Sequence, residues 1–405
     1  VESPLGLDAA TFTYSAGSDV TYYNHGVRVI GCESVNIDFQ RVDLKIRISD
    51  PKYISSISTD LSSCEFAYDE NRSDLDGAFR LATITIKDAM DVERRKFHLE
   101  SGCFQVYAGF GLCTRLKLES LKEGLGTPIT THTFYYNETS LLPLERSYYT
   151  DHYGYFNLNS EDLNSGASAG LGYPDWSVSK VSGVCTNGRN KSPSNDGALT
   201  FILNEIQYVS GSRTVLGYEV NGTPRVTSIS QYDGTNLVGK STFTYSGAEV
   251  YKTPIYHYYD TEAEPDLLIR SSHSYNSIID LNNVAVGYST VTEIFLDGSK
   301  IVRKFTNFSD YPDSDPSVNR YKVTTSVEYK GTSNKDSSPF TPYSSIAWMR
   351  GLLTWVEVRD DHDNSLQIQE FVYEPGPVLN TVWNMAAEPY RTEPGDFHFN
   401  VGDYM

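Results

Sequence analysis

Residues 151–155 (DHYGY) hold the densest group of side chains in this sequence that could do chemistry. An aspartate beside a histidine can orient the imidazole ring for general base catalysis. Consecutive residues of a strand point to opposite faces, so Asp151 and His152 are not expected to hydrogen-bond to each other. We interpret the stretch as a structural corner in which backbone groups satisfy His152.

Residues 166–170 (GASAG) match the GxSxG pattern around the nucleophilic serine of many hydrolases. That serine needs an apolar strand before it and a helix after it. Residues 157–165 are polar, and residues 171–174 (LGYP) cannot open a good helix, so we interpret the match as a loop. The sequence contains no P-loop, dinucleotide fingerprint or zinc-protease helix, so no catalytic residue and no enzyme activity are predicted.

Two acidic loops are candidates for cation binding. Calcium takes at least about six oxygen ligands in a tight loop, and neither loop has the EF-hand spacing. We therefore expect plain turns and no cofactor, with calcium as the alternative. The candidate calcium ligands are Asp310, Asp313 and Asp315, and the second loop contains Asp360, Asp361 and Asp363.

The cysteines do not form a metal-binding pattern. There are five, at Cys32, Cys64, Cys103, Cys113 and Cys185, so at least one is unpaired within the chain. None has CxxC or zinc-site spacing. We favour scattered buried thiols, with a disulfide bond between Cys103 and Cys113 across a hairpin as the alternative.

The composition favours an exported β protein. The 405 residues include 52 acidic and 33 basic side chains, and the net charge of -19 disfavours nucleic acid and anionic membranes as partners. The 30 Tyr outnumber the 18 Phe and 4 Trp combined, which is typical of half-buried strands. No apolar run is long enough for membrane insertion, and we expect Val1 to start a mature or excised chain.

One supersecondary unit recurs along the chain. It consists of an apolar-alternating strand, a polar turn and a returning strand that ends near a tyrosine or another aromatic residue. The dipeptides Asp233-Gly234 and Asp297-Gly298 favour hairpin turns, because glycine tolerates positive φ. The instances are residues 54–68, 80–99, 115–136, 203–218, 225–245, 288–308 and 350–373.

Isolated hairpins are marginal in water, so these units must stack edge to edge. We predict an all-β fold in which repeated β-hairpins form a large wound sheet; a sandwich or a barrel would also satisfy this need. The predicted regions are an N-terminal β segment (1–53), the hairpin repeat region (54–376) with a long loop (157–199), and a C-terminal strap or tail (377–405).

Several units begin with an arginine. We interpret these arginines as exposed strand-end cations whose stems cover apolar surface, and inward pairing with acidic residues of the next unit is the alternative. They are Arg80, Arg115, Arg225 and Arg350.

Several motifs follow one another in order over residues 54–376. They include FAYDENRSDL (66–75), RLATITIKD (80–88), LLPLERSYYTDHYGYFN (141–157), RVTSISQYDG (225–234), VGYSTVTEIFLDGSKIVRKFTNFSD (286–310) and MRGLLTWVEVRDDHDNSLQIQEFVYEPG (349–376). Their order resembles the RHS/YD-repeat-like secreted proteins of Bacteroidetes. Two departures from that family lie at residues 208–212 (YVSGS, where the family has YPTGG) and 151–154 (DHYG, where it has DHWG).

This resemblance implies a β-repeat strip or hollow shell and brings no catalytic residues. The predicted function is a non-enzymatic extracellular scaffold, secreted or at the cell surface, whose partners are other protein chains or further repeats of a longer chain. The alternative is an exported glycan- or receptor-binding module, and a hydrolase is least favoured. The glycan-binding alternative predicts a groove lined by Tyr148, Tyr149, Tyr153, Tyr155, Trp176 and Tyr256.

Overall fold

The computed structural model is built almost entirely of strands. Its described residues form 23 strands, one short helix, α1 (Asn195–Ala198), and one 3-10 turn, η1 (Ala347–Met349), so the predicted all-β class is confirmed. No helix in the described part of the chain is long and apolar enough to span a membrane. The structure describes residues 10–30, 38–69, 72, 74–75, 77–104, 115–125, 130–140, 150–158, 176–177, 184–185, 191–260, 267–271, 274, 276–313, 345–373, 384–390 and 398–404.

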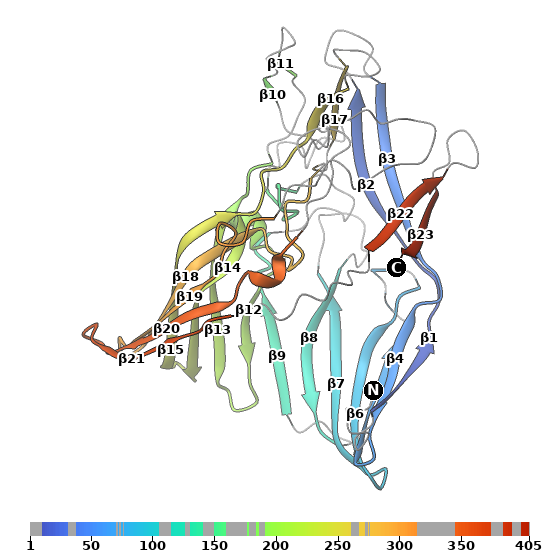
Figure 1. The fold of residues 1–405 in the computed structure, drawn as a ribbon. Helices are drawn as coiled ribbons and strands as arrows, with labels where there is room; N and C mark the ends of the chain where they lie inside the picture. The colour runs from blue at the N-terminus through green and yellow to red at the C-terminus, as the bar shows by residue number, and fades with distance from the viewer. Residues whose placement is uncertain are drawn as a thin grey trace.

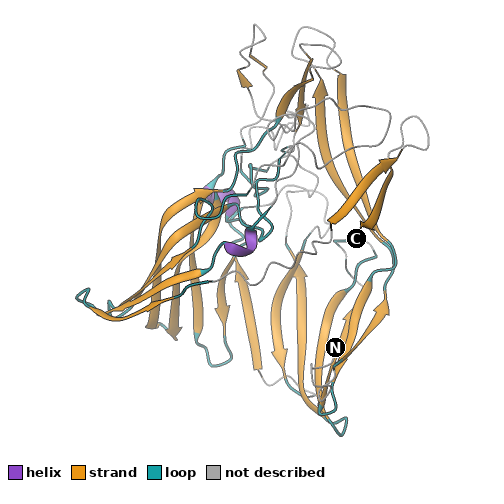
Figure 2. Cartoon of the chain, in the orientation of Figure 1, coloured by secondary structure: helices purple, strands orange, loops and turns teal. Residues whose placement is uncertain are grey.

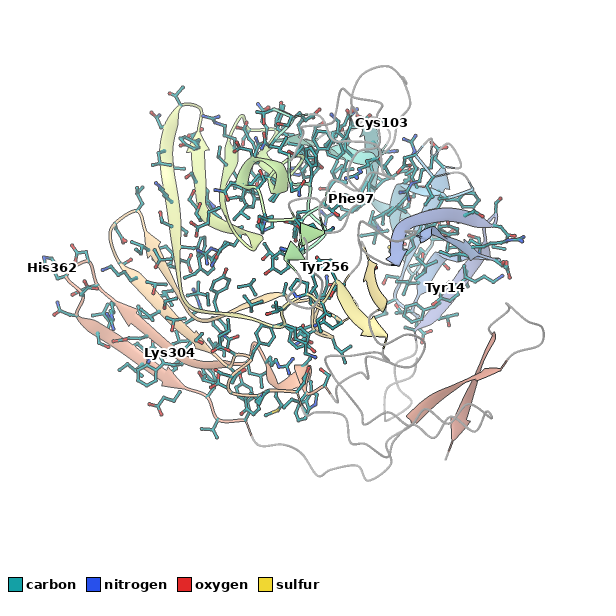
Figure 3. The ribbon with its side chains drawn as sticks, turned by 90° about the horizontal axis from the view of Figure 1, so that it is seen from above. Tyr14, Phe97, Cys103, Tyr256, Lys304 and His362 are labelled. Atoms are coloured by element: carbon teal, nitrogen blue, oxygen red, sulfur yellow. The ribbon has the colours of Figure 1, made fainter. Side chains whose placement is uncertain are left out.

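Fifteen strands pair into one antiparallel sheet, in the order β1-β4-β5-β6-β7-β8-β9-β12-β13-β14-β15-β18-β19-β20-β21 (Figure 1). Their bounds are β1 (Thr11–Ala16), β4 (Lys52–Ser58), β5 (Ser62–Asp69), β6 (Arg80–Asp88), β7 (Glu93–Cys103), β8 (Leu116–Glu123), β9 (Thr130–Tyr136), β12 (Leu203–Gln207), β13 (Arg213–Asn221), β14 (Thr223–Asp233), β15 (Asn236–Val250), β18 (Val286–Phe295), β19 (Lys300–Phe305), β20 (Leu353–Arg359) and β21 (Ser365–Glu370). From above, the sheet follows an arc from Tyr14 in β1 to His362 beside β21, and Tyr256 lies inside the arc (Figure 3).

The seven predicted hairpins all form as antiparallel strand pairs. They are β4–β5, β6–β7, β8–β9, β12–β13, β14–β15, β18–β19 and β20–β21. Each hairpin also pairs with the next one along the chain, for example through β5–β6 and β13–β14. Edge-to-edge stacking is therefore confirmed, whereas winding into a shell stays a prediction.

Three smaller sheets complete the fold (Figure 2). One has four strands in the order β16-β17-β2-β3, with bounds β16 (His257–Asp260), β17 (Leu267–Ser271), β2 (Val20–Ile30) and β3 (Asp38–Ile48). The others are the pairs β10 (Trp176–Ser177) with β11 (Val184–Cys185) and β22 (Asn384–Tyr390) with β23 (His398–Tyr404). The predicted N-terminal region thus contributes β1 to the large sheet and β2 and β3 to the four-stranded sheet.

Tyrosines near the end of a hairpin hold its two strands together. In four hairpins the hydroxyl of such a tyrosine donates to a main-chain carbonyl at or near the start of the first strand. Buried tyrosine hydroxyls need such a partner, which explains why the repeat closes on this residue type. The pairs are Tyr136 with Leu118, Tyr218 with Leu203, Tyr245 with Val226 and Tyr373 with Leu353.

The most buried apolar side chains lie at strand ends and in connecting segments. In the described residues, only Val20 and Val286 of this group belong to strands, and each is the first residue of its strand. The others include Phe104, Phe156 and Tyr256. The well-packed part of the molecule is therefore the set of segments at one end of the large sheet, and the polar clusters described next lie there.

Candidate functional site

The predicted corner at residues 151–155 is built on the Asp151 side chain. Its Oδ1 accepts hydrogen bonds from the main-chain N–H groups of Tyr153 (2.8 Å) and Tyr155 (2.9 Å). The main-chain N–H of Asp151 donates to the Tyr155 carbonyl, and Gly154 adopts a φ of 89°. This is a three-residue turn that ends in a left-handed residue, which is where glycine is favoured.

The main-chain N–H of His152 donates to the Lys191 carbonyl, but the imidazole bonds to a tyrosine, so the interpretation that backbone groups satisfy this side chain is wrong. Its Nδ1 lies 2.9 Å from the Tyr256 hydroxyl oxygen. Burial lowers the pKa of His152 and raises the pKa of Tyr256, so both side chains are neutral near pH 7. The hydrogen bond between the neutral imidazole and the phenol fixes the position of two segments 104 residues apart in sequence.

The second oxygen of Asp151 has no donor. The residue is only 2% exposed, and its Oδ2 is buried without a hydrogen-bond partner. Burial raises the pKa of Asp151 to about 6, against the lowering effect of its N–H donors and of Lys191. Lys191 is also buried; its Nζ donates to the Thr150 carbonyl and lies 5.7 Å from the centre of the Tyr256 ring. We call Asp151, His152, Lys191 and Tyr256 the corner cluster.

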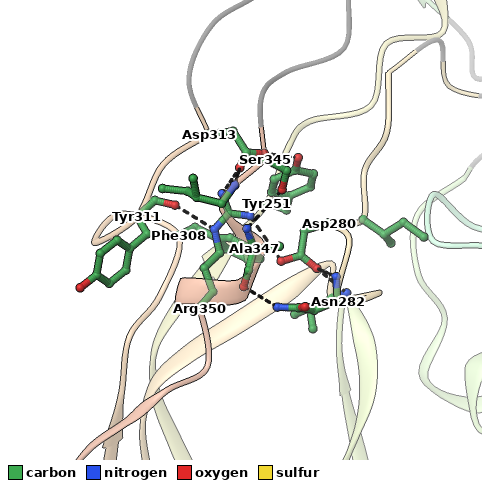
Figure 4. A network of polar contacts seen from close by, with 12 residues as sticks. Tyr251, Asp280, Asn282, Phe308, Tyr311, Asp313, Ser345, Ala347 and Arg350 are labelled. Carbon is green, nitrogen blue, oxygen red and sulfur yellow. Dashed lines mark hydrogen bonds and ion pairs between the residues drawn. The ribbon is translucent and has the colours of Figure 1, made fainter. Parts of the chain in front are cut away.

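A second buried cluster surrounds Arg350 (Figure 4). Its Nη1 donates to Asp280 (3.3 Å), its Nη2 pairs with Asp313, and its Nε donates to the Tyr311 carbonyl (2.8 Å). The side chains of Arg350, Asp280 and Asp313 are at most 4% exposed. The guanidinium carbon lies 5.5 Å from the centre of the Tyr251 ring and 5.3 Å from that of the Phe308 ring. We call this group the Arg350 cluster.

The arginines that open the repeats therefore do not match the exposed-cation interpretation. Arg350 points inward and pairs with two acids, and the guanidinium of Arg225 pairs with Glu219 and lies over the Tyr245 and Tyr288 rings. Arg80 pairs with Asp69. All three pair with acidic residues, as in the alternative, but these acids belong to preceding segments and not to the next unit, and only the Arg350 pairs are fully buried.

Asp313 serves the Arg350 cluster and offers no free oxygen to a cation. Its Oδ1 accepts from the Ile346 N–H and pairs with Arg350, and its Oδ2 accepts from the Tyr251 hydroxyl. Although burial raises the pKa of Asp313, the hydrogen bonds from Tyr251 and Arg350 bring it below its usual range. Of the other two calcium candidates, Asp310 accepts from the Asn307 N–H, and Asp315 lies outside the described residues.

The other acidic loop is an exposed hairpin turn between β20 and β21. Asp360 accepts from the main-chain N–H groups of His362 and Asn364, and Asp363 pairs with Lys300. Oxygen and nitrogen atoms of Asp360, Asp361 and His362 lie within 4.8 Å of one another. The turn hydrogen bonds account for this arrangement, and the interpretation that the loop is a plain turn stays a prediction.

The aromatic residues of the predicted glycan groove are not equivalent. Tyr155 is 38% exposed, whereas Tyr256 is 4% exposed and bonds to His152. Tyr153 packs against Gly222, where an added Cβ would lie 3.2 Å from its ring. Tyr148 and Tyr149 lie outside the described residues, as does the GxSxG match, and the structure describes only the strand position of Trp176.

The cysteines differ in state. Cys64 is a free thiol, and burial raises its pKa. Cys103 is disulfide-bonded, so the preference for unpaired thiols is wrong for this residue. Cys113 lies outside the described residues, so the alternative pairing of Cys103 with Cys113 stays a prediction.

Sequence reasoning missed the Arg350 cluster, although one signal for it was present. The pattern of Asp151, an aspartate followed three residues later by Gly, Asn or Asp, recurs at Asp280 with Asn283. Both aspartates cap a turn of the same kind and both are buried. The partner, Arg350, is 70 residues further along the chain, and no local pattern connects the two.

Comparisons with known proteins add little. No protein-family model matches the sequence, and no curated protein matches it. Among solved structures, the chain is similar to a porin-like protein from Bacteroides uniformis, with 12% sequence identity and a TM-score of 0.20, covering 67% of this chain and 92% of that chain. At this similarity neither fold nor function transfers from that protein, and the resemblance to RHS/YD-repeat-like proteins stays a prediction.

Proposed function

We propose that this chain is a non-enzymatic structural and interaction scaffold, of the exported β-repeat type, that joins other chains or further repeats through its sheet. The observation that carries the proposal is the stacking of seven hairpins, in sequence order, into one sheet of 15 strands. A sheet built in this way is extended by adding another strand at either end. Its work would then depend on its shape and its edges.

The polar clusters support the same proposal. The carboxylates of Asp280 and Asp313 accept from main-chain N–H groups and from Arg350, and Asp151 caps its own turn. An acid–base catalyst needs a group that faces a substrate and exchanges protons with it. These buried groups instead hold connecting segments in place, which is what a scaffold requires.

The end strands of the sheet are suited to contact with other chains. In β21 every residue is exposed, and Leu366 and Ile368 present apolar side chains beside a single charge, Glu370. In β1 every residue is exposed and none is charged. Natural edge strands are usually protected by charges, proline or a cover, so an unprotected edge favours pairing with an extended strand of another chain.

The proposal is tested with the full chain by sedimentation velocity over a range of protein concentrations. We expect the wild type to associate and Ile368→Lys, which places a charge in the edge strand, to reduce association at least tenfold. The control is Met90→Lys, because Met90 is also apolar and exposed but lies in the β6–β7 turn. A wild type that stays monomeric, or association that both variants leave unchanged, contradicts the proposal; specific binding on a glycan array would favour the glycan-binding alternative.

A further inference from the structure

The same aspartate-capped turn occurs four times in the part of the chain that the structure describes, and one copy lacks a contact that the other three have. In each copy Oδ1 of the aspartate accepts the N–H groups of the second and fourth following residues, and the third following residue has positive φ. In three copies Oδ2 also has a donor: Arg94 for Asp88, Arg350 for Asp280 and the Asn364 amide for Asp360. Asp151 is the fourth copy, and its Oδ2 is buried with no donor.

The missing donor makes the charge of Asp151 costly. A buried carboxylate oxygen without a hydrogen bond loses its hydration and gains nothing in return. The neutral acid avoids most of this cost, and its Oδ1 still accepts the two N–H groups of the turn. The turn is therefore better matched to a protonated Asp151 than to an ionised one.

The corner cluster also connects two sheets. His152 is bonded to Tyr256, and the Tyr256 carbonyl accepts the N–H of Ser271 in β17. Tyr256 immediately precedes β16, so both strands of the β16–β17 hairpin in the four-stranded sheet are tied to the corner. On the other side, Tyr153 packs against Gly222, between β13 and β14 of the large sheet.

We propose that Asp151 is a proton-controlled joint: its protonated form holds the 151–155 turn closed against Tyr256, and its ionisation loosens the attachment of the four-stranded sheet to the large sheet. The proposal is independent of the scaffold function. Charged and titratable groups face Asp151 from each packed segment. They are Lys191 before α1, Tyr256 before β16, and His152, Tyr153 and Tyr155 of its own turn.

The direction of the pH effect follows from the pKa of Asp151, which is raised from 3.8 to about 6. The closed state binds the proton more tightly than the open state, so closure is strongest below pH 3.8 and weakens as pH rises through about 6. Between pH 5 and pH 7.5 these two values correspond to about a tenfold increase in the open fraction. Lys191 opposes this change, because its positive charge favours the ionised form.

Hydrogen exchange of the full chain, measured by mass spectrometry at pH 5 and pH 7.5 and corrected for the intrinsic rate, tests the joint. We expect the protection of residues 150–158 and 252–257 to fall about tenfold at the higher pH. In Asp151→Asn, which keeps the acceptor for the two N–H groups and cannot ionise, protection should be the same at both pH values. Lys191→Gln, which removes the favourable cation, should deepen the loss at pH 7.5.

The same substitution in a sibling turn is the matched control. Asp280→Asn weakens the ion pair with Arg350, so we expect lower protection around residues 280–284 at both pH values. A wild type whose corrected protection does not change with pH overturns the proposal. So does a pH dependence that persists in Asp151→Asn, because another group would then be responsible.

Discussion

At Arg350, one buried cation holds two carboxylates that come from different segments. Asp280 and Asp313 would repel each other without it, and neither can reach water. Replacing a buried pair with apolar groups is often tolerated, but removing a single partner leaves uncompensated charge. The cluster is therefore most sensitive at its only cation.

Arg350→Met tests this asymmetry. We expect a loss of about 3–5 kcal/mol in the free energy of unfolding, measured by urea denaturation, because two buried acids lose their partner. Arg80→Met is the control, since Arg80 makes a half-exposed pair with Asp69 and should cost about 1 kcal/mol. Equal losses in the two variants would contradict the central role of Arg350.

The two strands of a hairpin are held together by hydrogen bonds that recur from one hairpin to the next. Tyrosine hydroxyls that donate to carbonyls of the partner strand act within a single hairpin, and so do the turn-capping aspartates Asp88 and Asp360. Such contacts are local in sequence, and each one stabilises a unit that then pairs with its neighbours. Their individual contributions are small, and their number compensates for a thin apolar core.

Tyr245→Phe measures the contribution of one of these hydrogen bonds to stability. The variant keeps the ring but loses the hydrogen bond to the Val226 carbonyl, so we expect a loss of about 1 kcal/mol in unfolding free energy. Tyr135→Phe is matched to it, because the Tyr135 hydroxyl bonds only to the exposed Gln207 side chain. If Tyr135→Phe were the more damaging change, the carbonyl contact would not be what holds the hairpin.

Gly222→Ala probes the close approach of Tyr153 to the large sheet. An added Cβ would lie 3.1 Å from Val286 and 3.2 Å from the Tyr153 ring, and φ is 76°. Gly211→Ala has a similar φ of 84° but open space around the Cβ, so it isolates the backbone cost of about 1 kcal/mol. Thermal unfolding should show a clearly larger decrease in Tm for Gly222→Ala, and equal decreases would exclude a steric contribution.

The hairpins could be predicted from sequence because their information is local. Alternation in 225–245 and the Asp233-Gly234 turn specify a strand pair without reference to the rest of the chain. The four-stranded sheet could not be predicted, because β2 pairs with β17 across more than 200 residues. The side-chain donor to Oδ2, which Asp280 has and Asp151 lacks, could not be predicted either, because its presence depends on segments that are distant in sequence.

At the scale of the whole molecule, the acidic charge has a thermodynamic effect. A net charge of -19 repels itself most strongly in the compact state, and salt screens that repulsion. This effect does not depend on any single residue. Salt screening can be distinguished from binding at a specific cation site, because only specific binding depends on the identity of the ion.

Tm should therefore rise with ionic strength, by the same amount in sodium chloride and potassium chloride. Differential scanning calorimetry at matched ionic strength can then include calcium chloride. Under the plain-turn interpretation of the loops at Asp310 and Asp360, calcium gives no extra increase beyond screening. A markedly larger shift with calcium would mean that one of the acidic loops binds the ion.

The sequence order of the large sheet also bears on how the protein forms. After β1, every strand of that sheet pairs with the strands that precede and follow it within the sheet, so most pairings join segments that are close in the chain. Contacts of short sequence separation close small loops and form quickly. A polypeptide that emerges N-terminus first can add one hairpin at a time to a growing template, whereas β2, among the described strands, must wait for its distant partner β17.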